Sequence, residues 1–132
     1  MTISSNDDII ILSSFDDNKF SEVLKMNENR EYCKAIADEL LSIYNGEVLN
    51  EDGEQMTLYD YFDDVLDYEF TITRSKEYKS VKIWVTLGGP NVWIDTSDSY
   101  IRLAWGTNRE EYPLSYYVSD EIDSIFEEYY QY

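Results

Sequence analysis

The side chains of this sequence that could take part in catalysis are mainly carboxylates. The chain of 132 residues has 28 aspartates and glutamates against 10 lysines and arginines, a formal net charge of −18, and no histidine. Two carboxylates at a controlled separation can act as the acid and base of a hydrolase. With so many acids, however, close pairs arise by chance, and the commonest general base is missing. The sequence therefore predicts no catalytic residue and a protein that is not an enzyme.

Metal and thiol chemistry have no support in the residue spacing. One cysteine and no histidine exclude the usual zinc patterns. If Gly53 took the glycine position of a calcium loop, Val48 and Tyr59 would stand where carboxylates are needed. Cys33 falls on the apolar stripe of a predicted helix, which indicates a packed core thiol rather than a nucleophile. We expect no metal and no cofactor.

The stretch LYDYFDDVLDYEF, residues 58–70, suggests a different use for the acids. Read at helical spacing, its apolar side chains fall on one face, and the opposite face carries Asp60, Asp63, Asp64 and Asp67. Neighbouring like charges on a helix cost about 0.2–0.5 kcal/mol per pair, and aspartate is a poor helix former. The arrangement is unfavourable for folding, which makes a functional reason plausible.

The acids are concentrated in two blocks that contain no base. Residues 35–73 hold eleven acids and residues 110–132 hold seven, whereas residues 74–109 are net positive. Such a charge repels nucleic acid and anionic membranes and attracts basic protein surfaces. A charge run is usually only a solvated face, and that interpretation stays open beside a functional one.

Mimicry of a nucleic-acid backbone is the functional interpretation we favour. Carboxylates three and four residues apart on a helix lie about 5–6 Å from each other, and DNA-binding proteins meet phosphates with lysine and arginine. A row of acids could therefore occupy a basic groove and exclude DNA. The predicted contact residues are Asp60, Asp63, Asp64 and Asp67, Glu51, Asp52 and Glu54 of the preceding loop, Tyr59, and a second candidate row of Asp120, Asp123, Glu127 and Glu128.

Helices and a small sheet must position these side chains. Apolar periodicity predicts helices at about residues 15–26 and within 29–46, a third from Thr57 to Asp67, and a last one from Ser119 to about Tyr130. Alternation of period two predicts strands within residues 68–73, 81–87, 92–95 and 101–105, with 106–113 as a loop. The fold class is therefore α+β: an antiparallel meander of about four strands with N-terminal helices and a C-terminal helix packed on it.

Three stretches resemble small acidic inhibitors from phages and mobile elements. They are TLGGPNVWIDT (86–96), YDYFDDVLD (59–67) and the acidic, aromatic tail SDEIDSIFEEYY (119–130). The class comprises anti-CRISPR and antirestriction proteins, and no single family is assigned. The resemblance implies a stoichiometric inhibitor that occupies the DNA-binding groove of a Cas nuclease or the DNA channel of a restriction enzyme.

The chain is thus predicted to be a single acidic domain over residues 1–132, of which 1–8 need not be ordered. We expect an inhibitor that blocks DNA binding by a nuclease, foremost a Cas9-type effector, through protein–protein contact and without binding nucleic acid or membrane. The alternatives are an immunity protein against a basic nuclease toxin, an antirestriction protein, and a housekeeping protein or hydrolase whose acidity is incidental. With no signal peptide, no long apolar run and a single cysteine, we expect the cytoplasm of a bacterial host cell. The oligomeric state stays open.

Overall fold

A computed structural model describes residues 17–65 and 67–131 of the chain, with side chains from residue 28 onward. Residues 1–8, which need not be ordered, and residues 15–16, at the start of the first predicted helix, lie outside the described residues. Within the described ranges, no helix combines the length and apolar character that a bilayer span requires.

The sheet is an antiparallel meander of five strands in the order β1-β2-β3-β4-β5. The strands are β1 (Asp67–Ile72), β2 (Tyr78–Thr86), β3 (Asn91–Asp95), β4 (Tyr100–Trp105) and β5 (Asn108–Pro113). Their alternation places Ile83, Ile94 and Ile101 opposite one another, all fully buried on one face of the sheet. Trp84 pairs with Trp93 on the other face, where both rings are half-buried and stack. The predicted α+β meander is confirmed, with five strands rather than four.

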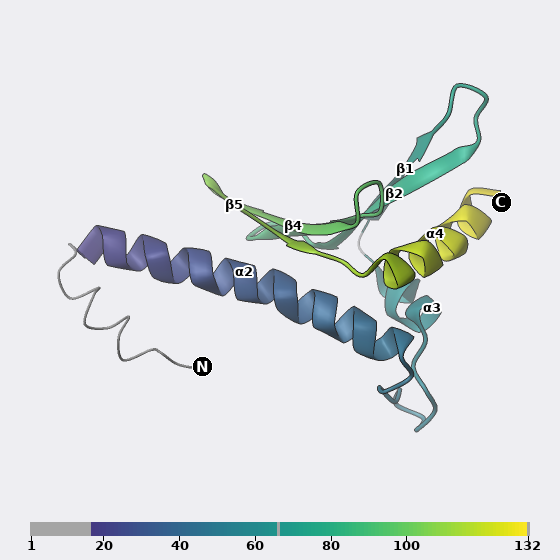
Figure 1. Ribbon diagram of the computed structural model, residues 1–132, viewed down its shortest axis with the longest axis horizontal. Coiled ribbons are helices and arrows are strands. Elements are labelled where there is room, and N and C mark those ends of the chain that lie inside the picture. The colour runs from purple at the N-terminus through teal and green to yellow at the C-terminus, as the bar shows by residue number, and fades with distance from the viewer. Residues whose placement is uncertain (1–16, 66, 132) are drawn as a thin grey trace.

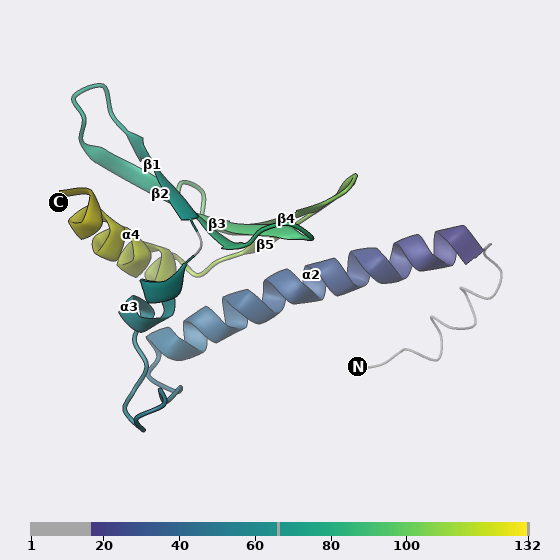
Figure 2. The same cartoon turned by 180° about the vertical axis from the view of Figure 1, so that it is seen from behind.

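Helices cover one face of this sheet. The long helix α2 (Asp17–Tyr44) crosses β4 and β5, and α4 (Tyr116–Gln131) packs on β2. Figures 1 and 2 show both helices on the same side of the sheet, with the short helix α3 (Leu58–Tyr61) between the end of α2 and α4. The core lies between the two layers, where Leu40, Phe62 and Phe126 are almost completely buried.

The two predicted N-terminal helices are one continuous helix. Neither glycine nor proline interrupts α2 between Asp17 and Tyr44, so nothing stops the helix at residue 26. The helix ends at Tyr44, within the predicted range of residues 29–46. Gly46 has φ +76°, and the amides of Gly46 and Glu47 donate to the carbonyls of Ile43 and Ser42, which closes the last turn.

The helix expected from Thr57 to Asp67 is much shorter. One α-turn (α3) is followed by one 3₁₀ turn, η1 (Phe62–Asp64), and strand β1 already begins at Asp67. Aspartates near a helix C-terminus oppose the helix dipole, and pairing of β1 with β2 holds residues 67–72 in a strand. The tertiary ladder therefore overrides the helical periodicity.

Two further boundaries differ from the prediction. Residues 106–113 are not a loop, because a two-residue turn at Gly106-Thr107 leads into β5, whose charged residues hide the strand pattern. Helix α4 begins one turn before Ser119, since the amide of Ser119 donates to the carbonyl of Ser115. The Ser119 side chain is buried and accepts a hydrogen bond from the Ser99 hydroxyl at 3.0 Å, so it does not cap the helix.

Substitution at the centre of the sheet should test this core. Ile94→Ala is expected to lower the free energy of unfolding by about 2–5 kcal/mol, because it opens a cavity between Ile83 and Ile101. The matched control is Ile72→Ala on the edge strand β1, where the side chain is 43% exposed and a loss below about 1 kcal/mol is expected. Urea unfolding measures both, and equal losses would contradict this placement of the core.

Candidate functional site

The predicted contact residues lie on four helices or strands and on one loop. Tyr59 and Asp60 lie on α3, Asp63 and Asp64 on η1, and Asp67 begins β1. The loop after α2 carries Glu51, Asp52 and Glu54, and α4 carries Asp120, Asp123, Glu127 and Glu128. All of these side chains are exposed except that of Asp123, which is half-buried.

The structure joins the two rows that the sequence offered as alternatives. The Tyr59 hydroxyl donates a hydrogen bond to the Glu128 carboxylate at 3.1 Å, and the Tyr59 ring meets the edge of the Tyr129 ring with centroids 5.9 Å apart. Burial, and then the nearby charge of Asp63, raise the pKa of Tyr129. Helices α3 and α4 thus lie side by side, and the Asp63 carboxylate of η1 lies near Tyr129 in the C-terminal half of α4.

Sequence reasoning missed one acid of this region. Glu121 lies two turns before Glu128 on α4, and both line a cavity that is also lined by Tyr59. Glu121 belongs to the second base-free block, residues 110–132, and this membership is the sequence feature that could have identified it as part of the surface. We define the α3–α4 acidic surface as Asp63, Asp64, Glu121 and Glu128.

Asp60 has a structural role. Its carboxylate accepts a hydrogen bond from the Thr57 amide at 3.0 Å, while its own amide donates to the Thr57 hydroxyl at 3.2 Å. These two hydrogen bonds form a capping box at the start of α3. Because the Asp60 carboxylate already accepts a hydrogen bond from the Thr57 amide, it is less available than Asp63 or Asp64 for contact with a partner.

Asp67 and Asp123 do not belong to the joined surface. Asp67 pairs with Trp84 across the β1–β2 ladder, and its carboxylate accepts the amide of Tyr68. Asp123 accepts a 2.6 Å hydrogen bond from the Tyr78 hydroxyl on β2, so it ties α4 to the sheet. Burial raises the pKa of Asp123 above its ordinary value of 3.8, and hydrogen bonds from Tyr78 and Thr96 oppose that rise.

The loop acids form a separate group. The Asn50 side chain accepts the amides of Asp52 and Glu54 and so orders the turn around Gly53. Figure 1 shows this loop extending below α3, away from the sheet. Glu51, Asp52 and Glu54 therefore lie at the end of a projection rather than on the α3–α4 acidic surface.

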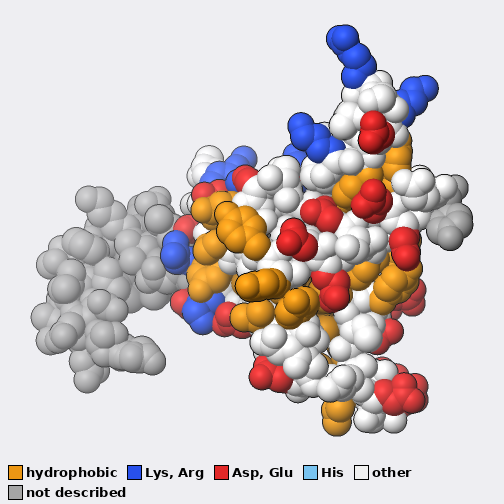
Figure 3. Space-filling view, turned by 45° about the vertical axis from the view of Figure 1, so that its right-hand side comes forward, with side chains coloured by type: hydrophobic (Ala, Val, Ile, Leu, Met, Phe, Trp, Pro, Cys, Tyr) orange, Lys and Arg blue, Asp and Glu red, His pale blue; other side chains and the backbone are white. Residues whose placement is uncertain are grey.

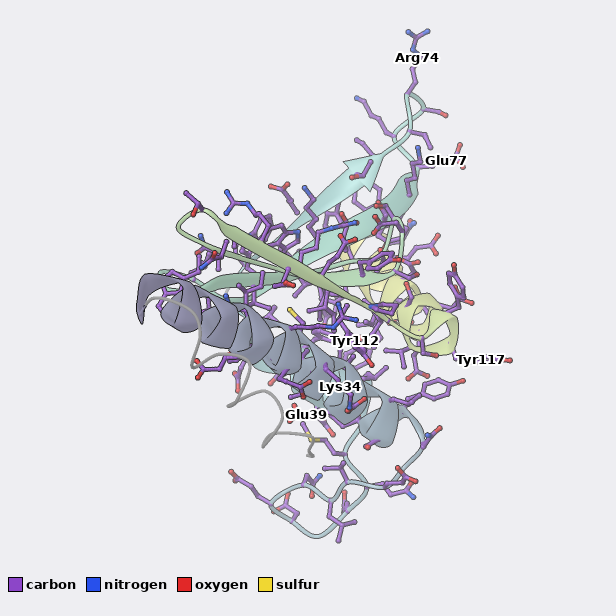
Figure 4. All side chains as sticks on the ribbon, turned by 60° about the vertical axis from the view of Figure 1, so that its left-hand side comes forward. Lys34, Glu39, Arg74, Glu77, Tyr112 and Tyr117 are labelled. Carbon is purple, nitrogen blue, oxygen red and sulfur yellow. The ribbon has the colours of Figure 1, made fainter. Side chains whose placement is uncertain are left out.

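Basic side chains lie elsewhere on the described part of the molecule. Arg74, Lys76 and Lys79 belong to the β1–β2 hairpin, and Figure 4 shows Arg74 at its tip. Arg102, on the outer face of the sheet, contacts the carboxylates of Asp95, Asp98 and Glu111. In Figure 3 the lysines and arginines gather at the hairpin and toward the opposite side, and carboxylates spread over the body between and below. The basic side chains of the hairpin therefore lie apart from the α3–α4 acidic surface.

Cys33 is a core residue, as its place on the apolar stripe predicted. The side chain is fully buried, and burial, with a smaller effect of the Glu110 charge, raises the pKa of the thiol to about 11. The thiolate is therefore scarcely populated at neutral pH. In the described ranges, no three carboxylate or thiol groups gather closely enough to hold a metal ion.

No family model, curated protein or solved structure matches the chain. The resemblance to phage and mobile-element inhibitors therefore stays a prediction, and the chemistry of the surface carries the functional argument.

Two aspartates of the predicted row should differ in their effect on stability. Asp60→Ala is expected to lower the free energy of unfolding by about 0.5–2 kcal/mol, because it removes half of the capping box. Asp64→Ala is expected to leave it unchanged or raise it slightly, since alanine is a better helix former and one repulsive charge is lost. Urea titration of both variants checks this, and a larger loss for Asp64→Ala would show the assignment to be wrong.

Asp123 should make stability depend on pH with a definite sign. Because its pKa is raised in the fold, the folded state binds this proton more tightly than the unfolded chain does. The stabilising contribution of Asp123 is therefore complete below pH 3.8, the ordinary pKa of the group, and is lost as the pH rises through the raised pKa. Asp123→Asn, whose amide oxygen still accepts from Tyr78, should consequently gain stability relative to the wild type as the pH rises from 3.8 through the raised pKa.

The control for this measurement is Asp52→Asn in the exposed loop, which removes the same charge from a site without the Tyr78 contact. Its difference from the wild type should stay constant over the same pH range in urea unfolding. A constant difference for Asp123→Asn as well would contradict the raised pKa.

Proposed function

We propose that this protein binds, through its α3–α4 acidic surface, the basic groove with which another protein holds nucleic acid, and that it blocks the groove by imitating the charge of the phosphate backbone. One observation carries the proposal: Glu128 of α4 accepts a hydrogen bond from Tyr59 of α3, and the charge of Asp63 on η1 acts on Tyr129 of α4. Exposed carboxylates of two elements thus lie close together in segments, residues 35–73 and 110–132, that contain no lysine or arginine.

The charges of this surface are held by the fold. The capping box orders the turn that precedes η1, and Phe62, immediately before Asp63, is buried against Phe126 of α4. Carboxylates on ordered segments lose little conformational entropy when a partner binds. A net charge of −18 also steers the protein toward basic surfaces and away from nucleic acid.

The target we propose is a bacterial nuclease, with a Cas9-type effector first. The resemblance of residues 59–67, 86–96 and 119–130 to phage and mobile-element inhibitors supports this choice, and the setting would be the cytoplasm of the host cell. The inhibitor would act stoichiometrically and without catalysis. In support of that, the chain has no histidine and its single thiol is buried.

A competition experiment tests the proposal. A guide-loaded Cas9-type nuclease is mixed with the protein, and binding of a fluorescent target duplex is followed by anisotropy. Duplex binding should be lost when the protein is added first and retained when the duplex is added first, since both need the same groove. Inhibition should weaken sharply between physiological salt and about 0.5 M salt, because exposed charges are screened.

Charge reversal locates the surface. Asp63→Lys/Asp64→Lys should raise the half-inhibitory concentration by about tenfold or more, because it sets two cations against a basic groove. The matched control, Glu28→Lys/Glu31→Lys, makes the same change in charge on exposed positions of α2 and should inhibit almost as the wild type does. Equal inhibition by both variants would overturn the site.

Two further arms of the experiment replace the Cas nuclease by a restriction endonuclease or by a nuclease toxin. Loss of duplex binding in either arm supports mimicry with a different target. A complex with the toxin that forms equally well when DNA fills its groove would overturn mimicry in favour of an immunity protein. Absence of binding in all three arms would overturn the proposed function.

A further inference from the structure

A cavity of about 390 Å³ opens beside the α3–α4 acidic surface. It lies between the end of α2, the loop that leads into α3, and the side of α4 that faces them. Its lining includes the buried side chains of Ile43, Leu58 and Ile125, which give it an apolar floor. A volume of this size is within the range of small-ligand pockets, about 300–1,000 Å³.

Two tyrosine rings line the cavity from different elements. Tyr44, at the end of α2, is 39% exposed and stacks on Tyr117 with ring centroids 6.4 Å apart. Tyr59, on α3, is held by its hydrogen bond to Glu128 and by its contact with Tyr129. Both rings are therefore supported by neighbours, so the walls of the cavity exist before any ligand arrives.

Two carboxylates complete the lining. Glu121 and Glu128 lie on one side of α4 with Ser124 between them. In the described part of the chain, neither forms an ion pair, since the salt bridges there involve only Lys34 and Arg102. No lysine or arginine lines the cavity. A ligand that supplied a cation would thus meet two carboxylates whose charge this region does not neutralise.

We propose that the cavity receives one arginine side chain of the basic partner. The inference rests on the proposed function and names the contact at its centre. A guanidinium group is planar and weakly hydrated, so it stacks on aromatic rings and donates paired hydrogen bonds to carboxylates. Its aliphatic stem can lie on the apolar floor. A lysine ammonium is a compact, strongly hydrated charge and fits this combination of rings and carboxylates less well.

An arginine in this cavity would serve as an anchor of the interface. Binding energy at protein interfaces concentrates in a few desolvated pockets, in which arginine, tyrosine and tryptophan are enriched. The exposed carboxylates of Asp63 and Asp64 would then steer the approach, and the cavity would hold the partner after contact. The exposed carboxylates would therefore mainly determine the association rate of the complex, and the cavity would mainly determine its dissociation rate.

Small blocked amino acids test the proposal without any partner protein. N-acetyl-arginine methylamide is titrated into the ¹⁵N-labelled protein, and backbone amide shifts are followed by NMR. The expected result is a saturable shift centred on the residues that line the cavity. The lysine analogue should bind several-fold more weakly, and the citrulline analogue, a neutral isostere of arginine, should cause no saturable shift. Equal binding of the citrulline and arginine probes would overturn the proposal.

Variants connect these shifts to the carboxylates. Glu121→Gln/Glu128→Gln should weaken binding of the arginine probe by about tenfold or more. The fold should be retained, because the side-chain oxygen of the glutamine introduced by Glu128→Gln can still accept the hydrogen bond from Tyr59. The matched control, Glu28→Gln/Glu31→Gln, removes two charges from exposed positions of α2 outside the cavity lining and should bind the probe as the wild type does. Equal weakening in both pairs would indicate diffuse charge attraction and overturn the site.

The two proposals fail separately. If the probe does not bind the cavity but the wild type still displaces DNA from the nuclease, the arginine site is wrong and mimicry stands. The probe could instead bind with the expected dependence on Glu121 and Glu128 while the protein displaces DNA from none of the three nucleases tested. In that case the cavity stands as a guanidinium site and the proposed function is wrong.

Discussion

The contact between Phe62 and Phe126 is the interaction on which the candidate surface depends. The two rings meet edge to face with centroids 5.6 Å apart, and both side chains are almost completely buried. Phe62 begins the 3₁₀ turn and is buried, while Asp63 and Asp64, which follow it, are exposed to solvent. A hydrophobic anchor thereby determines where the charges stand, because packed aromatic pairs add specific geometry to the burial of apolar area.

The acidic surface has a cost that the core must offset. Like charges on neighbouring positions repel, and these segments contain no base to relieve them. Individually such terms are small, and a packed core of fully buried isoleucines, leucines and phenylalanines outweighs them. Selection for stability alone would favour lysines among these acids. The absence of lysine and arginine from these two segments is explained if a partner provides the opposite charge.

The sequence predicted the class of the fold and much of the sheet, but not the geometry of the site. Alternation at Ile83, Ile94 and Ile101 identified central strands, because one face of each is buried. It could not reveal β5, whose edge position tolerates Arg109, Glu110 and Glu111. The helical periodicity of residues 58–67 was outweighed by pairing of β1 with β2, which local propensity does not contain. Long-range contacts likewise decided that Asp123 serves the fold and that Glu121 joins the cavity.

The position of the β1–β2 hairpin also shapes the electric field of the whole molecule. Arg74, Lys76 and Lys79 belong to the β1–β2 hairpin, which Figure 1 shows projecting away from α3, and Figure 4 shows Arg74 at its tip. The basic side chains of the hairpin and the carboxylates around α3 and α4 contribute a dipole to the described part of the molecule, in addition to the net charge of the chain. Near a cationic surface, that dipole produces a torque that turns the hairpin outward and the helical end inward. The molecule would arrive already oriented, so that fewer collisions are wasted on the wrong face.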